Sequence, residues 1–339
     1  MIRAVFGKLV GALTAVFGAS LVAFLFMRVL PGNPARLIVG PLATQQAITE
    51  QEKTMGLDQP LWIQYWRYIK GFFTGDWGFA YSAGETVTHE MAVRLPASAE
   101  LGLYAFLFAF LFAVVLALVA TYRHRPIVDG IIRGVSFFGL GTPPFWFGLI
   151  VLLLFSQVWH VFPGPDGRIG PNTTPPPSVT SFYTIDAIIA GQWGTFWDAF
   201  RHLILPAISL GLAPFAYLVR LLRANLLDIS RENFIVVARS KGLSRWNAFE
   251  HHALPNAFLP TLTAGGLLLA QLIAGSVLVE RVFNWPGIGG LVVDSILRQD
   301  YAVVQTFVLL SAVAYVVVNL GVDLLYGVID PRVRIPVTN

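Results

Sequence analysis

Hydrophobic positions along the chain form six long, continuous runs rather than short alternating segments. The runs cover residues 9–27, 97–121, 134–158, 202–219, 259–279 and 303–326. Each is close to the ~20 residues that an α-helix needs to cross a hydrocarbon core of ~30 Å. Because apolar and polar residues do not alternate within them, the runs predict helices rather than barrel strands. The pattern therefore predicts an all-α, polytopic membrane protein with six transmembrane helices.

Charged residues are scarce and lie almost entirely between the runs. They make up 12% of the 339 residues, about half the ~25% of a soluble domain. Only Glu100 and Asp323 fall inside the predicted spans. This composition excludes a water-soluble globule, a disordered chain and a collagen-like fibre. Cysteine is absent, so the chain has no disulfide framework, thiolate metal site or cysteine nucleophile.

The Lys and Arg residues predict the orientation. Segments 1–8, 122–133, 220–258 and 327–339 hold 13 of them in 72 residues, and the other inter-run segments hold 10 in 135. The positive-inside rule places the first set, with both termini, in the cytoplasm. The net charge of +4 is then explained by the excess of Lys and Arg in the cytoplasmic segments, and no nucleic-acid partner is expected. The first run continues to Met27, which favours an uncleaved helix over a signal peptide.

The segments predicted outside are long and have their own character. Residues 28–96 are rich in aromatic side chains and are predicted to form a structured periplasmic cap. Within them, positions 61, 65, 68 and 72 recur at helical spacing, and Gly71, Gly75 and Gly78 are expected to break the helix. Residues 163–177 contain six prolines and predict an extended strap. Residues 182–200 are apolar and aromatic and suit the membrane interface. The whole chain, 1–339, is predicted to be one transmembrane domain.

The longest segment predicted inside, 220–258, carries its own helix signals. Ser230 is a candidate N-cap, with Glu232 in the first turn of the helix. The positions 234, 237, 238 and 241 then share one helical face. Gly242 follows at the position after the helix, where a residue in the left-handed conformation commonly ends it, and Leu243 is its expected hydrophobic partner. Ser244 is a candidate cap for a second helix that Pro255 limits.

These signals predict a sharply bent pair of short helices with an exposed apolar surface. Periodicity alone leaves two interpretations open. The hairpin could rest on the lipid interface, or it could be a docking surface for a cytoplasmic partner.

The order of motifs along nearly the whole chain resembles one family. The stretches are Pro31-Gly32-Asn33-Pro34, Gly56 to Pro60, Gln64-Tyr65, Gly75 to Gly78, Glu100-Leu101-Gly102, Pro144 to Gly148, His202, Leu205-Pro206-Ala207, Gly211, Ala238 to Leu243, His252 to Ala257, Val279-Glu280, Phe283, Pro286 to Gly289, Asp300-Tyr301, Asn319-Leu320, Asp323, Tyr326 and Asp330-Pro331-Arg332. Together they resemble the permease subunits of binding-protein-dependent ABC importers, and more narrowly the first permease of the dipeptide, oligopeptide and nickel class.

The resemblance implies a type I importer permease in the bacterial inner membrane. Its expected partners are a second permease in a pseudo-twofold heterodimer, two ATPases inside that bind ATP and Mg, a solute-binding protein outside, and lipid. It implies that the 234–242 helix is the coupling helix, with contacts from Phe234, Val237, Ala238, Arg239, Lys241, Gly242 and Leu243. The wider signature has Glu-Ala-Ala where this chain has Val236-Val237-Ala238. Arg298-Gln299-Asp300 also lacks the basic residue usual beside the Asp.

The chain has no Gly-x-x-x-x-Gly-Lys-Ser/Thr stretch, so we expect no cofactor here and an energy source elsewhere. An ion-coupled secondary transporter is the alternative, and it needs intramembrane charges such as Glu100 and Asp323. Tyr315, Asn319, Asp323 and Tyr326 form one stripe of the sixth span. Gln271 and Gln305 are isolated amides inside spans. These polar residues could line a path or hydrogen-bond between helices.

A membrane-embedded enzyme is the remaining class. The adjacent His251 and His252 would point ~100° apart on a helix and could not easily share a metal. No Gly-x-Ser-x-Gly in a span and no His-Glu-x-x-His occurs in the chain, so neither a catalytic nor a metal site is expected. For the substrate, short peptides are the default of the family, while nickel chelates, glutathione, opines and oligosaccharides remain open.

Overall fold

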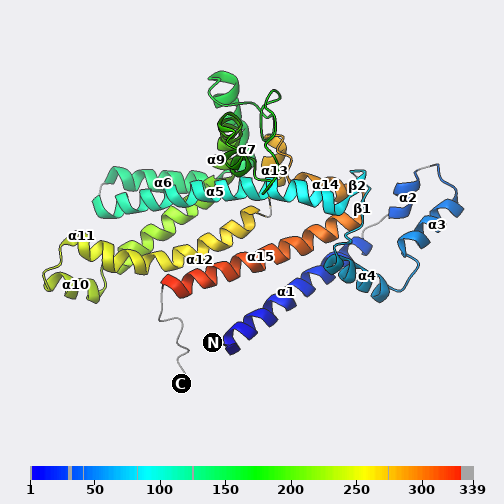
Figure 1. Cartoon of the computed structure of the whole chain (residues 1–339). Helices are drawn as coiled ribbons and strands as arrows, with labels where there is room; N and C mark the ends of the chain where they lie inside the picture. Colours follow the sequence, from blue (N-terminus) through cyan, green and yellow to red (C-terminus); the bar gives the residue numbers. More distant parts are fainter. Residues whose placement is uncertain are drawn as a thin grey trace. The chain divides into compact units, whose positions relative to one another are not determined.

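The computed structural model describes residues 2–29, 33–40, 42–81, 83–123, 126–273 and 275–329. Helices dominate these residues, and the two short strands form one antiparallel pair (Figure 1). The chain divides into two compact units, one of residues 1–96 and 287–316 and the other of residues 97–286 and 317–339.

The first unit contains the N-terminal helix and the segment predicted to be a cap. Its elements are α1 (Ile2–Val29), α2 (Pro34–Val39), α3 (Gln45–Met55), α4 (Leu61–Thr74), β1 (Phe79–Ala80), β2 (Glu85–Thr86), the start of α5 (Val87–Arg123), α14 (Ile288–Leu297) and the first part of α15 (Tyr301–Ile329). A buried cluster that includes Met91, Ile288 and Val303 forms its core. The segment 28–96 thus contains three helices, α2 to α4, among its described residues, and its role as a periplasmic cap stays a prediction.

The helix predicted from the Leu61–Phe72 spacing is present as α4. One of its side chains, Tyr68, forms a hydrogen bond with α15. The Tyr68 hydroxyl donates to the backbone oxygen of Gln305 (2.9 Å). Gly75 ends the helix with φ +77°. The expectation that Gly71 also breaks the helix was wrong, because Gly71 lies inside α4; a Cβ there would approach the Asp76 oxygen to 2.6 Å.

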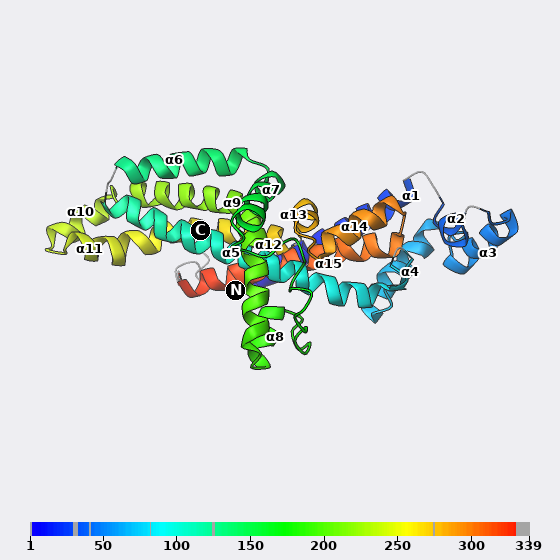
Figure 2. The same cartoon turned by 90° about the horizontal axis from the view of Figure 1, so that it is seen from above.

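The second unit holds the rest of the helices. They are most of α5, α6 (Pro126–Gly141), α7 (Pro144–Leu152), the π-helical η1 (Leu153–Val158), α8 (Tyr183–Ile189), α9 (Trp193–Ile229), α10 (Asn233–Ser240), α11 (Arg245–Ala248), the π-helical η2 (Phe249–Ala253), α12 (Leu254–Ile273) and α13 (Val277–Val282), with the end of α15. α6 and α12 both pack against α9 (Figure 2). No helix or strand occurs within residues 163–177, consistent with the predicted strap.

Four helical stretches among the described residues are long and apolar enough to cross a membrane. They are Val87–Tyr122, Trp193–Ile229, Arg245–Ile273 and Tyr301–Gly321. Leu13–Val29 is a shorter apolar helix and coincides with most of the first predicted span. The six-span count therefore remains a prediction, and two of the predicted spans need correction.

The run 134–158 is not one straight helix. The axes of Ile127–Gly141 and Pro144–Val158 differ by 107°, as the turn from α6 into α7 shows in Figure 1. Pro143 has no backbone N–H to continue α6, and Pro144 stands at the first position of α7, where proline is well tolerated. The continuous hydrophobicity of this run predicted one helix, whereas Pro143 and Pro144 break it into two.

The run 259–279 is also interrupted, because α12 ends at Ile273 and α13 begins at Val277. Gly275 between them has φ +88°, a conformation that favours glycine and ends the helix. α9, in contrast, is longer than the predicted 202–219. It continues at both ends and contains Pro206 and Pro214 within its length.

Candidate functional site

The short helix α10, which carries the candidate coupling residues, is defined by its two ends. Ser230 belongs to the end of α9, where its hydroxyl donates to the Leu226 oxygen (2.6 Å). The expectation that Ser230 caps α10 was therefore wrong, and Glu232 occupies the N-cap position without a side-chain hydrogen bond. α9 runs further than hydrophobicity suggested, so the turn between the helices is only a few residues long.

The C-terminal end of α10 confirms the predicted bend. Gly242 has φ +92°. Its N–H donates to the Arg239 oxygen (3.0 Å), and the Leu243 N–H donates to the Ala238 oxygen (3.3 Å). These two bonds form the Schellman arrangement, in which a left-handed residue satisfies the last carbonyls of a helix. Gly242 thus turns the chain sharply out of α10.

The second short helix begins as predicted but does not end there. The Ser244 hydroxyl accepts a hydrogen bond from the Asn247 N–H (3.2 Å), which caps α11. α11 then continues through η2 into α12, so Pro255 does not limit the helix. Pro255 is the second residue of α12. The change from π-helical to α-helical bonding accommodates a residue that cannot donate.

α10 turns one side to the protein and the other outward. Ile235 is 6% exposed and packs in a core cluster with Leu226 and Phe249. Phe234 and Val237 are 44% and 51% exposed, and Ala238 is half-buried. The predicted face of positions 234, 237 and 241 is thus the outward one. Val236, not predicted as part of it, is also exposed at 56%.

Two basic side chains flank this apolar surface. Arg239 and Lys241 are exposed, and neither makes a side-chain hydrogen bond or ion pair with the residues that the structure describes. Their charges are therefore available to an acidic surface. Leu243 is half-buried and follows the bend.

An aromatic cluster anchors the hairpin to the end of α5. The Tyr122 ring meets the Trp246 ring edge-on, with centroids 4.9 Å apart, and lies 6.0 Å from the Phe249 ring. The Arg245 guanidinium lies 5.6 Å from the Tyr122 centroid. Sequence reasoning missed this cluster. The only signal was the spacing of Trp246 and Phe249 by three positions, which puts both on one helical face.

The structure describes three of the polar residues predicted inside spans, each by its own surroundings. Gln271 is exposed on α12 in the second unit. Gln305 is 5% exposed in the first unit, and its side-chain nitrogen has no hydrogen-bond partner among the described residues. Asn319 is half-buried on α15. The Asp323 and Tyr326 side chains lie outside the described residues, so their predicted stripe is not tested.

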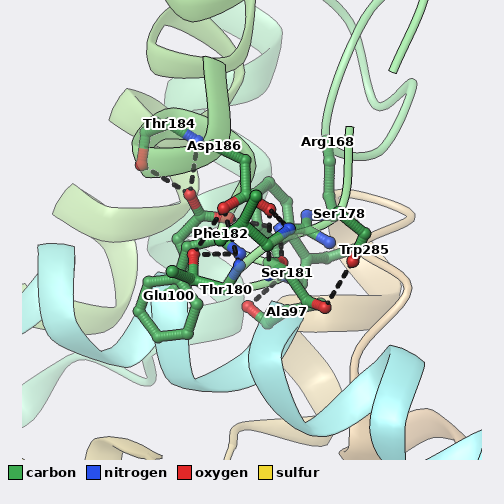
Figure 3. A network of polar contacts seen from close by, with 11 residues as sticks. Ala97, Glu100, Arg168, Ser178, Thr180, Ser181, Phe182, Thr184, Asp186 and Trp285 are labelled. Carbon is green, nitrogen blue, oxygen red and sulfur yellow. Dashed lines mark hydrogen bonds and ion pairs between the residues drawn. The ribbon is translucent and has the colours of Figure 1, made fainter. Parts of the chain in front are cut away.

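Glu100, considered above as an ion-coupling charge, is engaged in a buried network (Figure 3). Its carboxylate is fully buried and accepts from Arg168 Nη2 (2.6 Å) and from the amide and hydroxyl of Thr184 (2.9 and 2.6 Å). Arg168 comes from the strap and also donates to the Ser181 oxygen (2.7 Å). Glu100 therefore ties the strap and α8 to α5.

A second carboxylate supports the same region. Asp186 accepts from the amides of Val179, Thr180 and Ser181 and from the Thr180 hydroxyl. Burial alone would raise the pKa of the Asp186 carboxyl, but these hydrogen bonds hold it below its ordinary value. Among the described residues, no group of three or more His, Asp or Glu side chains is arranged to hold a metal ion.

Comparison with known proteins assigns the chain to a family. Residues 104–335 match the model for the inner membrane component of binding-protein-dependent transport systems, and residues 1–101 match the model for the N-terminal part of such membrane components. The chain belongs to this family. It is a permease subunit of a binding-protein-dependent ABC importer, of the dipeptide and oligopeptide class.

Curated relatives align along nearly their whole length. The chain is 38% identical to the dipeptide transport system permease protein DppB of Escherichia coli K12, over 98% of this chain and 99% of that protein. It is 38% identical to the probable D,D-dipeptide permease DdpB of the same strain, over 95% of each. The glutathione permease GsiC of the same strain is 33% identical over 98% of this chain and 99% of that protein.

Membership of the family settles the class of function. The permease is a multi-pass protein of the inner membrane and is not itself catalytic. Importers of this kind include ATPase subunits, a solute-binding protein and a second permease. The comparisons offer no support for an ion-coupled transporter or a membrane-embedded enzyme, and the buried ion pair of Glu100 explains that charge structurally.

Proposed function

We propose that this permease forms half of the transmembrane path of an importer for short peptides or a related small solute. The other half is a second permease, related by a pseudo-twofold axis. Two ATPases bind ATP and Mg on the inside, and a solute-binding protein delivers the substrate outside. The names of the relatives, which transport dipeptides, D,D-dipeptides or glutathione, support a small peptide as substrate.

The helix α10 is proposed as the coupling element. The observation that carries this assignment is its division into a buried anchor, Ile235, and an exposed apolar surface that includes Phe234 and Val237. A partner that binds the exposed side pushes on a helix whose other side is held in the core. Packed interiors deform little, so the push reaches α9 and α12 as a rigid-body movement. A hairpin resting on lipid would need no such anchor.

The orientation follows from the same proposal. An ATPase contact at α10 places the 220–258 segment and both termini in the cytoplasm, in agreement with the distribution of Lys and Arg. The segment 28–96 then faces the periplasm. There it contacts the solute-binding protein or shields the mouth of the path.

The coupling role is tested with a charged substitution at the bend. Gly242→Glu should abolish transport and ATPase association while the permease still inserts in the membrane. Gly191→Glu is the matched control, because Gly191 also has a positive φ of +67° and, like Gly242, no atom within 4 Å of the place that a Cβ would occupy. Normal uptake by the Gly242→Glu importer would reject the coupling role.

The substrate is tested separately. A strain that lacks the permease should take up labelled dipeptides more slowly than its parent, and a plasmid copy should restore the rate. The contents of the pocket of the co-purified solute-binding protein identify the cargo directly. Dipeptide uptake that is unchanged on deletion would exclude peptides as the main cargo in that cell.

A further inference from the structure

A cavity of about 780 Å³ lies between α6 and α9. It is lined by Ile132, Arg133, Ser136, Phe137, Leu140, Gly141, Arg220, Arg223, Ala224, Leu227, Asp228 and Arg231. Two contacts show that these helices run antiparallel. The Ser136 hydroxyl donates to the Ala216 oxygen (3.4 Å), and Arg223 Nη2 donates to Asp129 Oδ1 (2.6 Å).

The lining is strongly basic. It contains four arginines and one acid, Asp228. Arg223 is paired with Asp129. Arg133, Arg220 and Arg231 are exposed, and none of the three forms an ion pair with any described residue. The cavity therefore presents net positive charge to an anion.

The position along α9 gives the depth of this charge in the membrane. Arg201 and Arg220 are 19 positions apart in one helix, and no Lys, Arg, Asp or Glu occurs between them. At 1.5 Å per residue this interval spans about 28 Å, which matches a hydrocarbon core of ~30 Å. Arg220 therefore stands at the level of the lipid headgroups.

The other end of the cavity is apolar and lies deeper. Phe137 is 87% exposed and Leu140 is 44% exposed. Their neighbour Gly139 approaches Leu212 and Ala216 of α9, which are inside the uncharged interval. Along the cavity, arginines at headgroup level are thus followed by exposed apolar side chains at hydrocarbon level. A phospholipid has the same order, with a charged headgroup outside and apolar acyl chains inside.

We propose that the cavity binds an anionic phospholipid, with its phosphate between Arg133 and Arg220 and its acyl chains along Phe137 and Leu140. Guanidinium groups suit phosphate because they donate hydrogen bonds in a planar fork. Basic pockets between transmembrane helices bind such headgroups in membrane proteins. A zwitterionic lipid carries a compensating ammonium group and gains less from this net charge.

The test uses the importer assembled with its partner subunits, in nanodiscs of phosphatidylcholine with or without phosphatidylglycerol. Native mass spectrometry counts the lipids that stay bound after extraction. Arg133→Gln and Arg220→Gln should each weaken phosphatidylglycerol retention about fivefold, the factor that corresponds to one basic side chain near a membrane surface. Arg201→Gln, in the same helix but outside the cavity, should leave retention unchanged.

A second measurement needs no change of charge. A photo-crosslinking residue in place of Phe137 should label phosphatidylglycerol in the assembled importer. Crosslinking to the second permease instead would show a subunit interface and overturn the proposal. Equal retention of phosphatidylcholine and phosphatidylglycerol by the wild type, or undiminished retention by the Arg133→Gln/Arg220→Gln double variant, would overturn it as well.

Discussion

Nη2 of Arg168 lies 2.6 Å from Oε2 of Glu100, and both side chains are buried although 68 positions separate them in the sequence. Arg168 also stacks on Tyr183, with its guanidinium carbon 3.6 Å from the ring centroid. The pair fastens the proline-rich strap to α5. Removing one partner of a buried pair leaves an uncompensated charge, which typically costs about 3–5 kcal/mol.

Glu100→Gln should therefore destabilise the permease by an amount in that range. Thermal unfolding of the detergent-purified importer measures the loss. The double variant Glu100→Gln/Arg168→Gln should recover part of it, because no unpaired charge is left buried. Glu85→Gln is the control, since Glu85 is exposed and pairs with the equally exposed His89. Equal losses in the Glu100 and Glu85 variants would contradict a structural role for the buried pair.

The loop that precedes α8 should depend on the ionisation of Asp186. A lowered pKa means that the charged form is stabilised in the folded state. That stabilisation is present above the ordinary carboxyl pKa near 4 and is lost as the pH falls through the lowered value. Cleavage by pepsin within residues 178–182 should therefore accelerate as the pH drops below about 4.

Asp186→Asn should remove this pH dependence, because the amide cannot ionise. Cleavage of that variant should be fast across the whole acidic range. Asp166→Asn, an exposed position in the neighbouring strap, should behave as the wild type. A pH profile of Asp186→Asn that overlays the wild-type profile would show that another group controls the loop.

Two motif glycines should resist any side chain because helix backbones approach them closely. A Cβ at Gly102 would lie 2.6 Å from the Leu272 oxygen, and one at Gly211 would lie 2.7 Å from the Ala105 oxygen. Since backbone cannot move aside easily, Gly102→Ala and Gly211→Ala should each cost about 1–3 kcal/mol. Thermal unfolding of the purified importer provides the measurement.

Gly134→Ala supplies a control of opposite sign. Gly134 is inside α6 with nothing within 4 Å of a Cβ, so alanine should stabilise that helix by up to about 1 kcal/mol. If Gly102→Ala were as well tolerated as Gly134→Ala, that result would contradict the close approach of α5 to α12 at Gly102.

The bend at Gly242 should be sensitive to conformation rather than to size. No atom lies within 4 Å of a Cβ there, but φ is +92°. Asparagine tolerates positive φ better than alanine. Gly242→Asn should therefore retain more ATP-dependent uptake than Gly242→Ala, although asparagine is larger. Uptake rates in reconstituted vesicles decide this, and a ranking by side-chain volume would point to a packing role instead.

Local features were predictable where neighbouring residues alone determine them. The apolar runs located most of the long helices but not the breaks within 134–158 and 259–279. The Gly242–Leu243 signal located the end of α10, because a Schellman bend consists of bonds between residues at most five positions apart. The Ser244 cap was predictable for the same reason. Hydrophobicity alone misplaced the ends of α9 and α12, since helix ends depend on caps and on backbone conformation at positions such as Gly275.

The sequence by itself determined the family, the membrane class and the place of the bend that follows α10. Only the tertiary structure decided that Ile235 points inward while Phe234 points out, that Glu100 pairs with Arg168, and that Arg133 and Arg220 share one cavity. The physical reason is separation along the chain. Periodicity and capping act within a few residues, whereas burial and ion pairing depend on which distant segments pack together.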